Sequence, residues 1–164
     1  MLLLLQVVLY CLLLVLLIKC EVKNDGLNCL CFYPPEFRAK AQERGLADEA
    51  AAMKKGKRFL ARFCFIMLAV LLLTLSFWNR VPDFKTAYFQ AALFLAAANW
   101  FDGIVLDRLW VGHSRLWRIA GMEDVPYIKP WKTVLVRRTL ATVLYLILAL
   151  AVAGAAAALA KIVL

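Results

Sequence analysis

The sequence AYFQAALFLAAANWFDGIVL, residues 87–106, is an apolar run in which only Asp102 carries a charge. An α-helix of this length rises about 30 Å, which matches the thickness of the hydrocarbon core of a bilayer. The run ends in a group of polar and aromatic residues, from Asn99 to Trp110, with His113 just beyond it. We therefore predict a membrane-spanning helix that carries polar side chains close to one of its ends.

Three further stretches have the same apolar character, and the four runs together decide the fold class. The chain has 164 residues, of which 65% are hydrophobic, whereas soluble domains are about 45–50% apolar. We predict an all-α integral membrane protein, a bundle of four transmembrane helices that forms one membrane domain over residues 1–164. The expected spans are residues 2–18, 59–78, 87–106 and 139–160, and the connectors are residues 19–58 and 107–138. The first run is expected to stay uncleaved, because no basic residue precedes it and no small-residue cleavage site follows it.

The first connector contains signals for two further helices. A short helix is expected over residues 36–44, because Pro35 suits the start of a helix and Gly45 suits its end. Asp48 is a good N-terminal cap for a second helix that runs toward Lys54 and Lys55. These elements predict either a weakly amphipathic segment on the membrane surface or a solvated basic connector.

Lysine and arginine residues are distributed unevenly, and this sets the expected orientation. The first connector together with Arg62 holds 10 of the 20, and the second connector through Arg138 holds 7. The turn between the second and third spans holds 2, and the C-terminal end holds 1. Because basic residues are retained in the cytoplasm, we expect both connectors in the cytoplasm and both termini outside it.

The basic character also bears on the partners of the chain. A net charge of +9 would indicate nucleic acid as the partner of a soluble protein. Here the basic residues crowd against the ends of the apolar runs, where anionic lipid headgroups lie. We therefore expect contacts with anionic lipid headgroups of the bilayer and none with nucleic acid.

Small residues recur four apart in the third and fourth spans, as in Ala87 and Ala91, and in Ala149, Ala153 and Ala157. Small faces allow helix backbones to approach closely in a membrane. We predict that the third and fourth spans pack tightly against each other. The alternative is that the alanine-rich half of the fourth span joins a second copy of the chain or another membrane subunit.

The polar residues near the end of the third span form the candidate site. On an α-helix, at about 100° per residue, Asn99, Asp102 and His113 share one face, whereas Asp107 lies about 140° from Asp102. Functionally, Asn99, Asp102, Asp107 and His113 would form a polar membrane site that opens to the cytoplasm and binds a cation, a proton or a lipid headgroup. The alternative is an ordinary helix end in which Asp102 bonds to a neighbouring Arg or Trp.

Three arginines are expected at the same depth as Asp102, namely Arg62, Arg137 and Arg138. They are candidates for binding an anionic group such as a phosphate, because guanidinium groups match phosphate geometry. Because they lie at this depth, they also favour the interpretation in which Asp102 pairs with an arginine.

Known catalytic patterns are incomplete in this chain. Asp102-Gly103 resembles the opening of the metal-binding motif of CDP-alcohol phosphotransferases, but Leu106-Asp107 stands where that motif has Ala-Arg, and its further aspartates are absent. A separation of about 140° on a helix also argues against the paired aspartates of prenyltransferases. Small multidrug exporters also use four short helices, but they carry a glutamate in the first span, where this chain has only Gln6. We predict no metal site, and the sequence identifies no cofactor.

Cys29 and Cys31 flank Leu30 in the first connector. Two thiols at this spacing near a membrane are candidates for acylation or for half of a soft-metal site. The alternative is that both are ordinary reduced cytosolic thiols.

The segments 99–110, with His113, Gly121-Met122-Glu123-Asp124 and Tyr33-Pro34-Pro35-Glu36, resemble a family of uncharacterised small bacterial membrane proteins, some of them labelled transporter permeases. The resemblance covers about the middle half of the chain. It implies a four-helix protein of the bacterial inner membrane and transfers no functional residue.

Two functions follow from these observations. The first is a non-enzymatic, transport-associated or partner-binding membrane subunit, favoured by the small-residue faces, the basic cytoplasmic surface and the incomplete catalytic motifs. The second is a membrane-embedded enzyme that acts on a lipid or isoprenoid at the cytoplasmic face through Asp102, Asp107 and His113. The second requires that these three side chains meet in one cavity.

Overall fold

The computed structural model describes residues 2–23 and 25–163, and within these ranges the regular structure is entirely helical. Four of its helices are long and apolar enough to cross a membrane. They are Leu2–Val22, Glu49–Trp78, Phe84–His113 and Trp131–Ala160. The predicted fold class, all-α with four transmembrane helices, is confirmed, and the chain is a multi-pass membrane protein.

The described residues form six α-helices, and two of these, α3 and α4, continue into π-helical segments. The helices are α1 (Leu2–Val22), α2 (Pro35–Glu43), α3 (Glu49–Leu73) followed by a π-helical turn (Thr74–Trp78), α4 (Phe84–Phe101) followed by a π-helical segment (Asp102–Trp110) and α5 (Val111–His113), and α6 (Trp131–Val163). Two short 3-10 helices, Gly26–Phe32 and Arg115–Trp117, lie in the connectors.

The helices extend beyond the predicted spans, so that the connectors are shorter than residues 19–58 and 107–138. The largest differences are at α3 and α6, which begin ten and eight residues before the expected spans at 59 and 139. Asp48 caps α3 by accepting hydrogen bonds from the amides of Ala50 and Ala51, and the basic residues that follow continue the same helix. Pro130 directly precedes α6, which therefore includes both Arg137 and Arg138.

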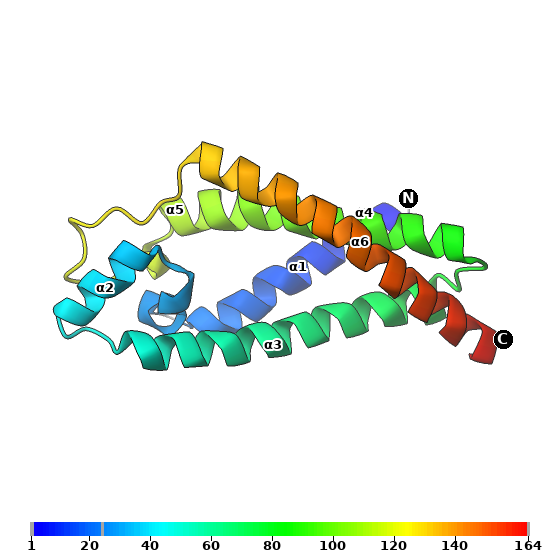
Figure 1. The fold of residues 1–164 in the computed structure, drawn as a ribbon, viewed down its shortest axis with the longest axis horizontal. Coiled ribbons are helices and arrows are strands. Elements are labelled where there is room, and N and C mark those ends of the chain that lie inside the picture. The colour runs from blue at the N-terminus through cyan, green and yellow to red at the C-terminus, as the bar shows by residue number, and fades with distance from the viewer. Residues whose placement is uncertain (1, 24, 164) are drawn as a thin grey trace.

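Figure 1 shows the four long helices running along the longest axis of the molecule. The turn between α3 and α4 and the two termini lie toward one end, which we call the terminal end. The short helix α2 and the two long connectors lie at the opposite end, which we call the connector end. The expected helix over 36–44 is confirmed as α2, and Gly45 follows it with a positive φ of 69°.

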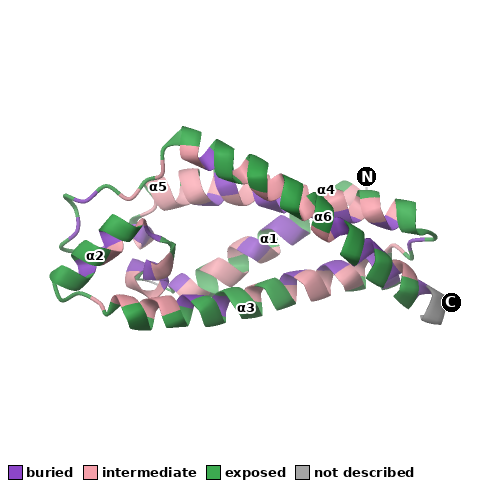
Figure 2. Ribbon diagram, in the orientation of Figure 1, coloured by how far each residue is buried: buried purple, intermediate pink, exposed green. Residues whose placement is uncertain are grey.

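The third and fourth spans form the most extensive helix–helix contact, between α4 and α6. Ala87, Ala91, Ala149 and Ala153 are fully buried there, as expected for small residues that allow close approach. The prediction that these spans pack together is confirmed. Exposed residues run along α3 and α6 (Figure 2). They include leucines, isoleucines and phenylalanines, which suits contact with lipid tails.

The connector end has a hydrophobic core of its own, built from both connectors. Tyr33 stacks on Phe37 with ring centroids 4.7 Å apart, and its hydroxyl donates to the carbonyl of Trp117 over 2.6 Å. Tyr127 lies against both of these rings. Burial raises the pKa of the Tyr33 phenol, with the neighbouring Tyr127 adding to the shift, so the hydroxyl stays a donor. This core places the two connectors over the end of the bundle.

Candidate functional site

The π-helical segment Asp102–Trp110 changes the faces on which its side chains lie. In a π-helix the backbone bonds join residues five apart, as the amide of Val111 does with the carbonyl of Leu106. Residues five apart are therefore closer together in direction than they are on an α-helix. Asp102 and Asp107 both point toward α6, and their predicted separation of about 140° is wrong because it assumed α-helical geometry throughout.

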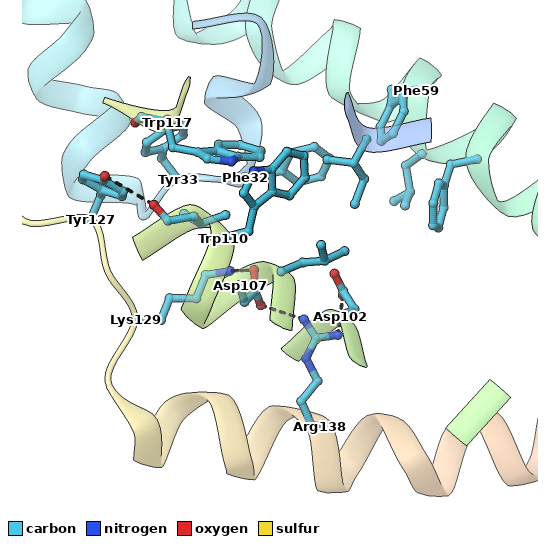
Figure 3. Close-up of a pocket in the computed structure, with 15 residues that line it drawn as sticks. Phe32, Tyr33, Phe59, Asp102, Asp107, Trp110, Trp117, Tyr127, Lys129 and Arg138 are labelled. Atoms are coloured by element: carbon cyan, nitrogen blue, oxygen red, sulfur yellow. Dashed lines mark hydrogen bonds and ion pairs between the residues drawn. The ribbon is translucent and has the colours of Figure 1, made fainter. Parts of the chain in front are cut away.

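Arg138 of α6 lies between the two carboxylates and pairs with both. One guanidinium nitrogen lies 2.6 Å from Asp102 Oδ2 and the other lies 2.6 Å from Asp107 Oδ2 (Figure 3). The side chains are only partly exposed, at 17% for Arg138, 31% for Asp102 and 23% for Asp107. The alternative interpretation of Asp102, in which it pairs with a neighbouring arginine, thus describes part of the site.

Gly103 makes room for this arginine. A Cβ atom at position 103 would lie 2.6 Å from Cγ and 2.7 Å from Nε of Arg138. Such distances are far inside van der Waals contact, so any side chain at this position would move the Arg138 stem. The glycine that suggested a phosphotransferase motif therefore serves the passage of Arg138 across the helix.

Lys129 completes a charged group that consists of Asp102, Asp107, Arg138 and Lys129, and it was not among the predicted site residues. Its ammonium lies 3.0 Å from Asp107 Oδ1, so both oxygens of Asp107 are paired. The Lys129 carbonyl accepts a hydrogen bond from Arg108, whose guanidinium also lies over the Trp131 ring. Lys129 stands in a non-helical segment between two prolines, where no periodic pattern exists that could have placed it.

Asn99 lies about one turn before Asp102 on α4 and forms hydrogen bonds to Arg138. Its Nδ2 donates to the Arg138 carbonyl over 2.9 Å and to Thr142 Oγ1 over 3.0 Å. Its Oδ1 accepts a longer bond, 3.4 Å, from the Arg138 guanidinium. Asn99 is 3% exposed, so these bonds satisfy a buried amide.

The structure separates the other predicted residues from this group. His113 is exposed, and its Nδ1 lies 2.9 Å from the carbonyl of Leu109. Arg62 has a 69% exposed side chain and pairs loosely with Glu21 at 3.6 Å. Arg137 is exposed on α6. The structure therefore brings together Asn99, Asp102, Asp107 and Arg138, and leaves His113, Arg62 and Arg137 outside.

A cavity of about 210 Å³ opens beside the charged group at the connector end. Asp102, Asp107, Lys129 and Arg138 form its charged wall. Aromatic side chains from both connectors, α3 and the π-helical segment form most of the remainder (Figure 3): Phe32, Tyr33, Phe59, Phe63, Trp110, Trp117 and Tyr127. The site thus combines a compact set of charges with an apolar, aromatic enclosure, as ligand sites commonly do.

A second cavity of about 120 Å³ adjoins the first toward the middle of the bundle. The two share Phe63, Asp102 and Arg138, so the charged group stands at their junction. The second cavity is lined mainly by apolar side chains such as Leu14 and Leu148. An elongated ligand with one polar end could occupy both.

The two connector cysteines lie apart from this cavity. Cys29 is fully buried, and burial together with the adjacent Cys31 raises the pKa of its thiol to about 12. Burial also raises the pKa of the Cys31 thiol, which packs against Gly56. Thiols with raised pKa values are poor nucleophiles at neutral pH. In the described part of the chain, no three His, Cys, Asp or Glu side chains gather closely enough to hold a metal ion.

Comparisons with protein-family models, with curated proteins and with solved structures found no match to this chain.

Proposed function

We propose that the protein is a non-enzymatic subunit of the bacterial inner membrane that binds an amphipathic, lipid-like molecule at the cytoplasmic face. It would hold this molecule for a transport process or for a partner protein. The observation that supports this most is the main cavity at the connector end, which joins aromatic walls to a neutralised set of charges. The inner-membrane location in this proposal comes from the resemblance to small bacterial membrane proteins.

The orientation in this proposal comes from the distribution of charge. The connector end carries most of the lysines and arginines of the sequence. These residues would contact anionic lipid headgroups of the inner leaflet, where basic segments are held. Both termini would then lie outside the cytoplasm, and the cavity would open near the inner leaflet.

Binding is favoured over catalysis by the state of the charged side chains. Asp107 is paired through both oxygens, and Asp102 is paired through one. Arg138 lies between the two carboxylates, in the place that a bridging metal ion would need. Arg138 and Lys129 thus occupy three of the four carboxylate oxygens, so this group suits recognition better than proton transfer.

A membrane enzyme that acts on a lipid or isoprenoid remains the second candidate. The observation that favours it is the convergence of Asp102 and Asp107 on one cavity. The predicted third member, His113, lies outside that cavity. Incubation of the purified protein with isoprenoid diphosphates and divalent cations, followed by product analysis, would distinguish the two: turnover that Asp102→Asn abolishes would favour the enzyme.

Native mass spectrometry of the protein, purified in mild detergent with and without a chelator, tests the proposed function directly. We expect a retained lipid-like adduct that survives the chelator. A bare chain under both conditions would contradict the proposal, and an adduct that chelation removes would favour a metal site. A partner subunit would be seen as an additional mass.

The orientation is tested separately with the natural cysteines. Cys20 is exposed at the connector end of α1. A thiol reagent that does not cross membranes should modify it in inverted membrane vesicles but not in intact cells. The reverse pattern would place the connector end outside the cytoplasm.

A further inference from the structure

Two polar atoms at the main cavity have no partner, and they indicate what the ligand must offer. Trp117 is 3% exposed, and its indole N–H has no hydrogen-bond partner among the described residues. Asp102 pairs with Arg138 through Oδ2 only, and within the same residues Oδ1 accepts no bond. Since buried polar groups are nearly always satisfied, a fitting ligand brings an acceptor to the buried indole of Trp117. The remaining oxygen of Asp102, whose side chain is 31% exposed, is open to a donor on the same ligand.

The charges of the site restrict the ligand further. Two carboxylates, one guanidinium and one ammonium line the cavity, and their formal charges sum to zero. A ligand with a net charge would leave that charge uncompensated in a site walled mostly by aromatic side chains, which is costly. A zwitterion avoids this cost. Its cation would face Asp102, and its anion would accept from Trp117 and from Lys129, whose ammonium has donors beyond the one used for Asp107.

The cationic end must itself donate a hydrogen bond. The free Oδ1 of Asp102 is a strong acceptor, and a charge-assisted bond to an ammonium N–H is about twice as strong as a neutral one. A primary ammonium supplies such N–H groups, whereas a quaternary ammonium has none. The free atoms therefore favour a primary amine over a choline-like group, although aromatic walls alone would accept either.

The remainder of the ligand is apolar. The second cavity continues from the charged group between α1, α3 and α6, with Leu14, Met67 and Leu148 in its walls. On this basis, and resting on the proposed function, we infer that the cavity binds a phospholipid with a zwitterionic headgroup that carries a primary ammonium, of the phosphatidylethanolamine type. Its headgroup would occupy the main cavity, and an acyl chain would follow the second.

The inference is tested by competition among lipids with identical acyl chains. The full-length protein in mild detergent is exchanged with an equimolar mixture of phosphatidylethanolamine, phosphatidylcholine and phosphatidylglycerol, and the retained lipid is measured by native mass spectrometry. We expect phosphatidylethanolamine to be retained about tenfold over either competitor, the value of one charged hydrogen bond.

Two variants assign this preference to the two free atoms. Asp102→Asn should reduce retention of phosphatidylethanolamine about tenfold and that of phosphatidylcholine much less, because only the primary amine donates a hydrogen bond to the carboxylate. Trp117→Phe should reduce all three lipids equally, because each carries a phosphate. Asp124→Asn and Trp131→Phe, which alter an exposed carboxylate and an exposed indole that do not line the cavity, serve as matched controls.

The outcomes separate this inference from the proposed function. Equal retention of the ethanolamine and choline lipids, or preference for phosphatidylglycerol, would overturn the headgroup assignment while the protein remained a lipid-binding subunit. Retention of no lipid would overturn both. Soluble phosphoethanolamine should displace the lipid weakly, and full displacement at matched concentration would identify a free zwitterion as the ligand. The melting temperature of each variant shows whether a loss of lipid retention reflects a loss of folding. Trp117→Phe keeps an aromatic ring and should therefore change the melting temperature little.

Discussion

The two ends of the bundle each hold a polar cluster beside a π-helical segment, yet the clusters differ in kind. At the terminal end, Gln6 donates to Asn79 over 2.7 Å, and Asn79 donates to Gln90 over 2.7 Å. All three side chains are neutral, and Gln6 is 3% exposed. At the connector end the cluster consists of Arg138, Lys129 and two carboxylates, all of them partly exposed to a cavity.

The difference agrees with a structural role for the amides and with the proposed binding role for the charged side chains. Neutral amides join helices in a membrane at small cost, and this chain of amides connects α1, the turn after α3, and α4. Ionised groups are expensive at such depth and contribute little net stability when buried as pairs. Charges that line a cavity are therefore better explained by a ligand than by folding, and the following predictions test this contrast.

Arg138→Ala should have the largest effect, because it leaves Asp102 and Asp107 without their shared counter-charge. Removing one partner of a buried ion pair costs about 3–5 kcal/mol. We expect a loss of this size in the free energy of unfolding, measured by denaturant titration in mixed micelles. Arg137→Ala, on the exposed neighbouring position, is the matched control and should change little.

The neutral triple variant Asp102→Asn, Asp107→Asn, Arg138→Met sharpens this test. If the charges serve binding, the triple variant should regain most of the lost stability, since neutral replacements of buried ion networks are often tolerated. It should still fail to retain lipid. A triple variant as unstable as Arg138→Ala would instead assign the network to folding and break the contrast.

Gly103→Ala should have the second largest effect. The new methyl would overlap the stem of Arg138, and overpacking of this kind costs about 1–3 kcal/mol. Displacement of the guanidinium should also weaken lipid retention. Gly154→Ala is the matched control, because a Cβ at that helical glycine meets no atom within 4 Å and should be neutral or slightly stabilising.

Gln6→Leu tests the opposite end of the bundle and should have a smaller effect. It removes the bond to Asn79 and leaves the Asn79–Gln90 bond in place. Interhelical hydrogen bonds in membranes are worth about 0.6 kcal/mol on average and up to about 1.7. We expect a loss of that order in unfolding free energy with unchanged lipid retention. Reduced retention would mean that the two clusters are coupled.

The contrast between the clusters also shows how far the sequence could be interpreted. The four spans follow from long apolar runs, and the contact between α4 and α6 follows from small residues spaced four apart. Asn99 and Asp102 stand out because polar groups are rare in such runs. The meeting of Asp102 with Asp107 could not be predicted, because it depends on a π-helical segment that no α-helical period reveals. Lys129 is placed by the fold of a connector around the aromatic core.

The smallest predicted effect concerns an ion pair outside the membrane, which sets a baseline for the charged cluster. Arg44 binds both oxygens of Asp124, at 2.8 and 2.7 Å, on the exposed surface of the connector end. Hydrogen bonds from Arg44 lower the pKa of Asp124 to about 2. Since an unperturbed aspartate has a pKa of about 3.9, any stabilisation by this pair is present above pH 4 and is lost as the pH falls toward 2. We expect the carboxyl carbon of Asp124 to titrate near pH 2 by NMR in micelles, and near pH 4 in Arg44→Gln. The melting temperature at neutral pH should change little, because exposed pairs are weak.

A titration that Arg44→Gln leaves unmoved would show that the pair does not form in solution. A large loss of stability at neutral pH would show that surface charge at this end is worth as much as the charge that lines the cavity, and the contrast between the clusters would then need another explanation.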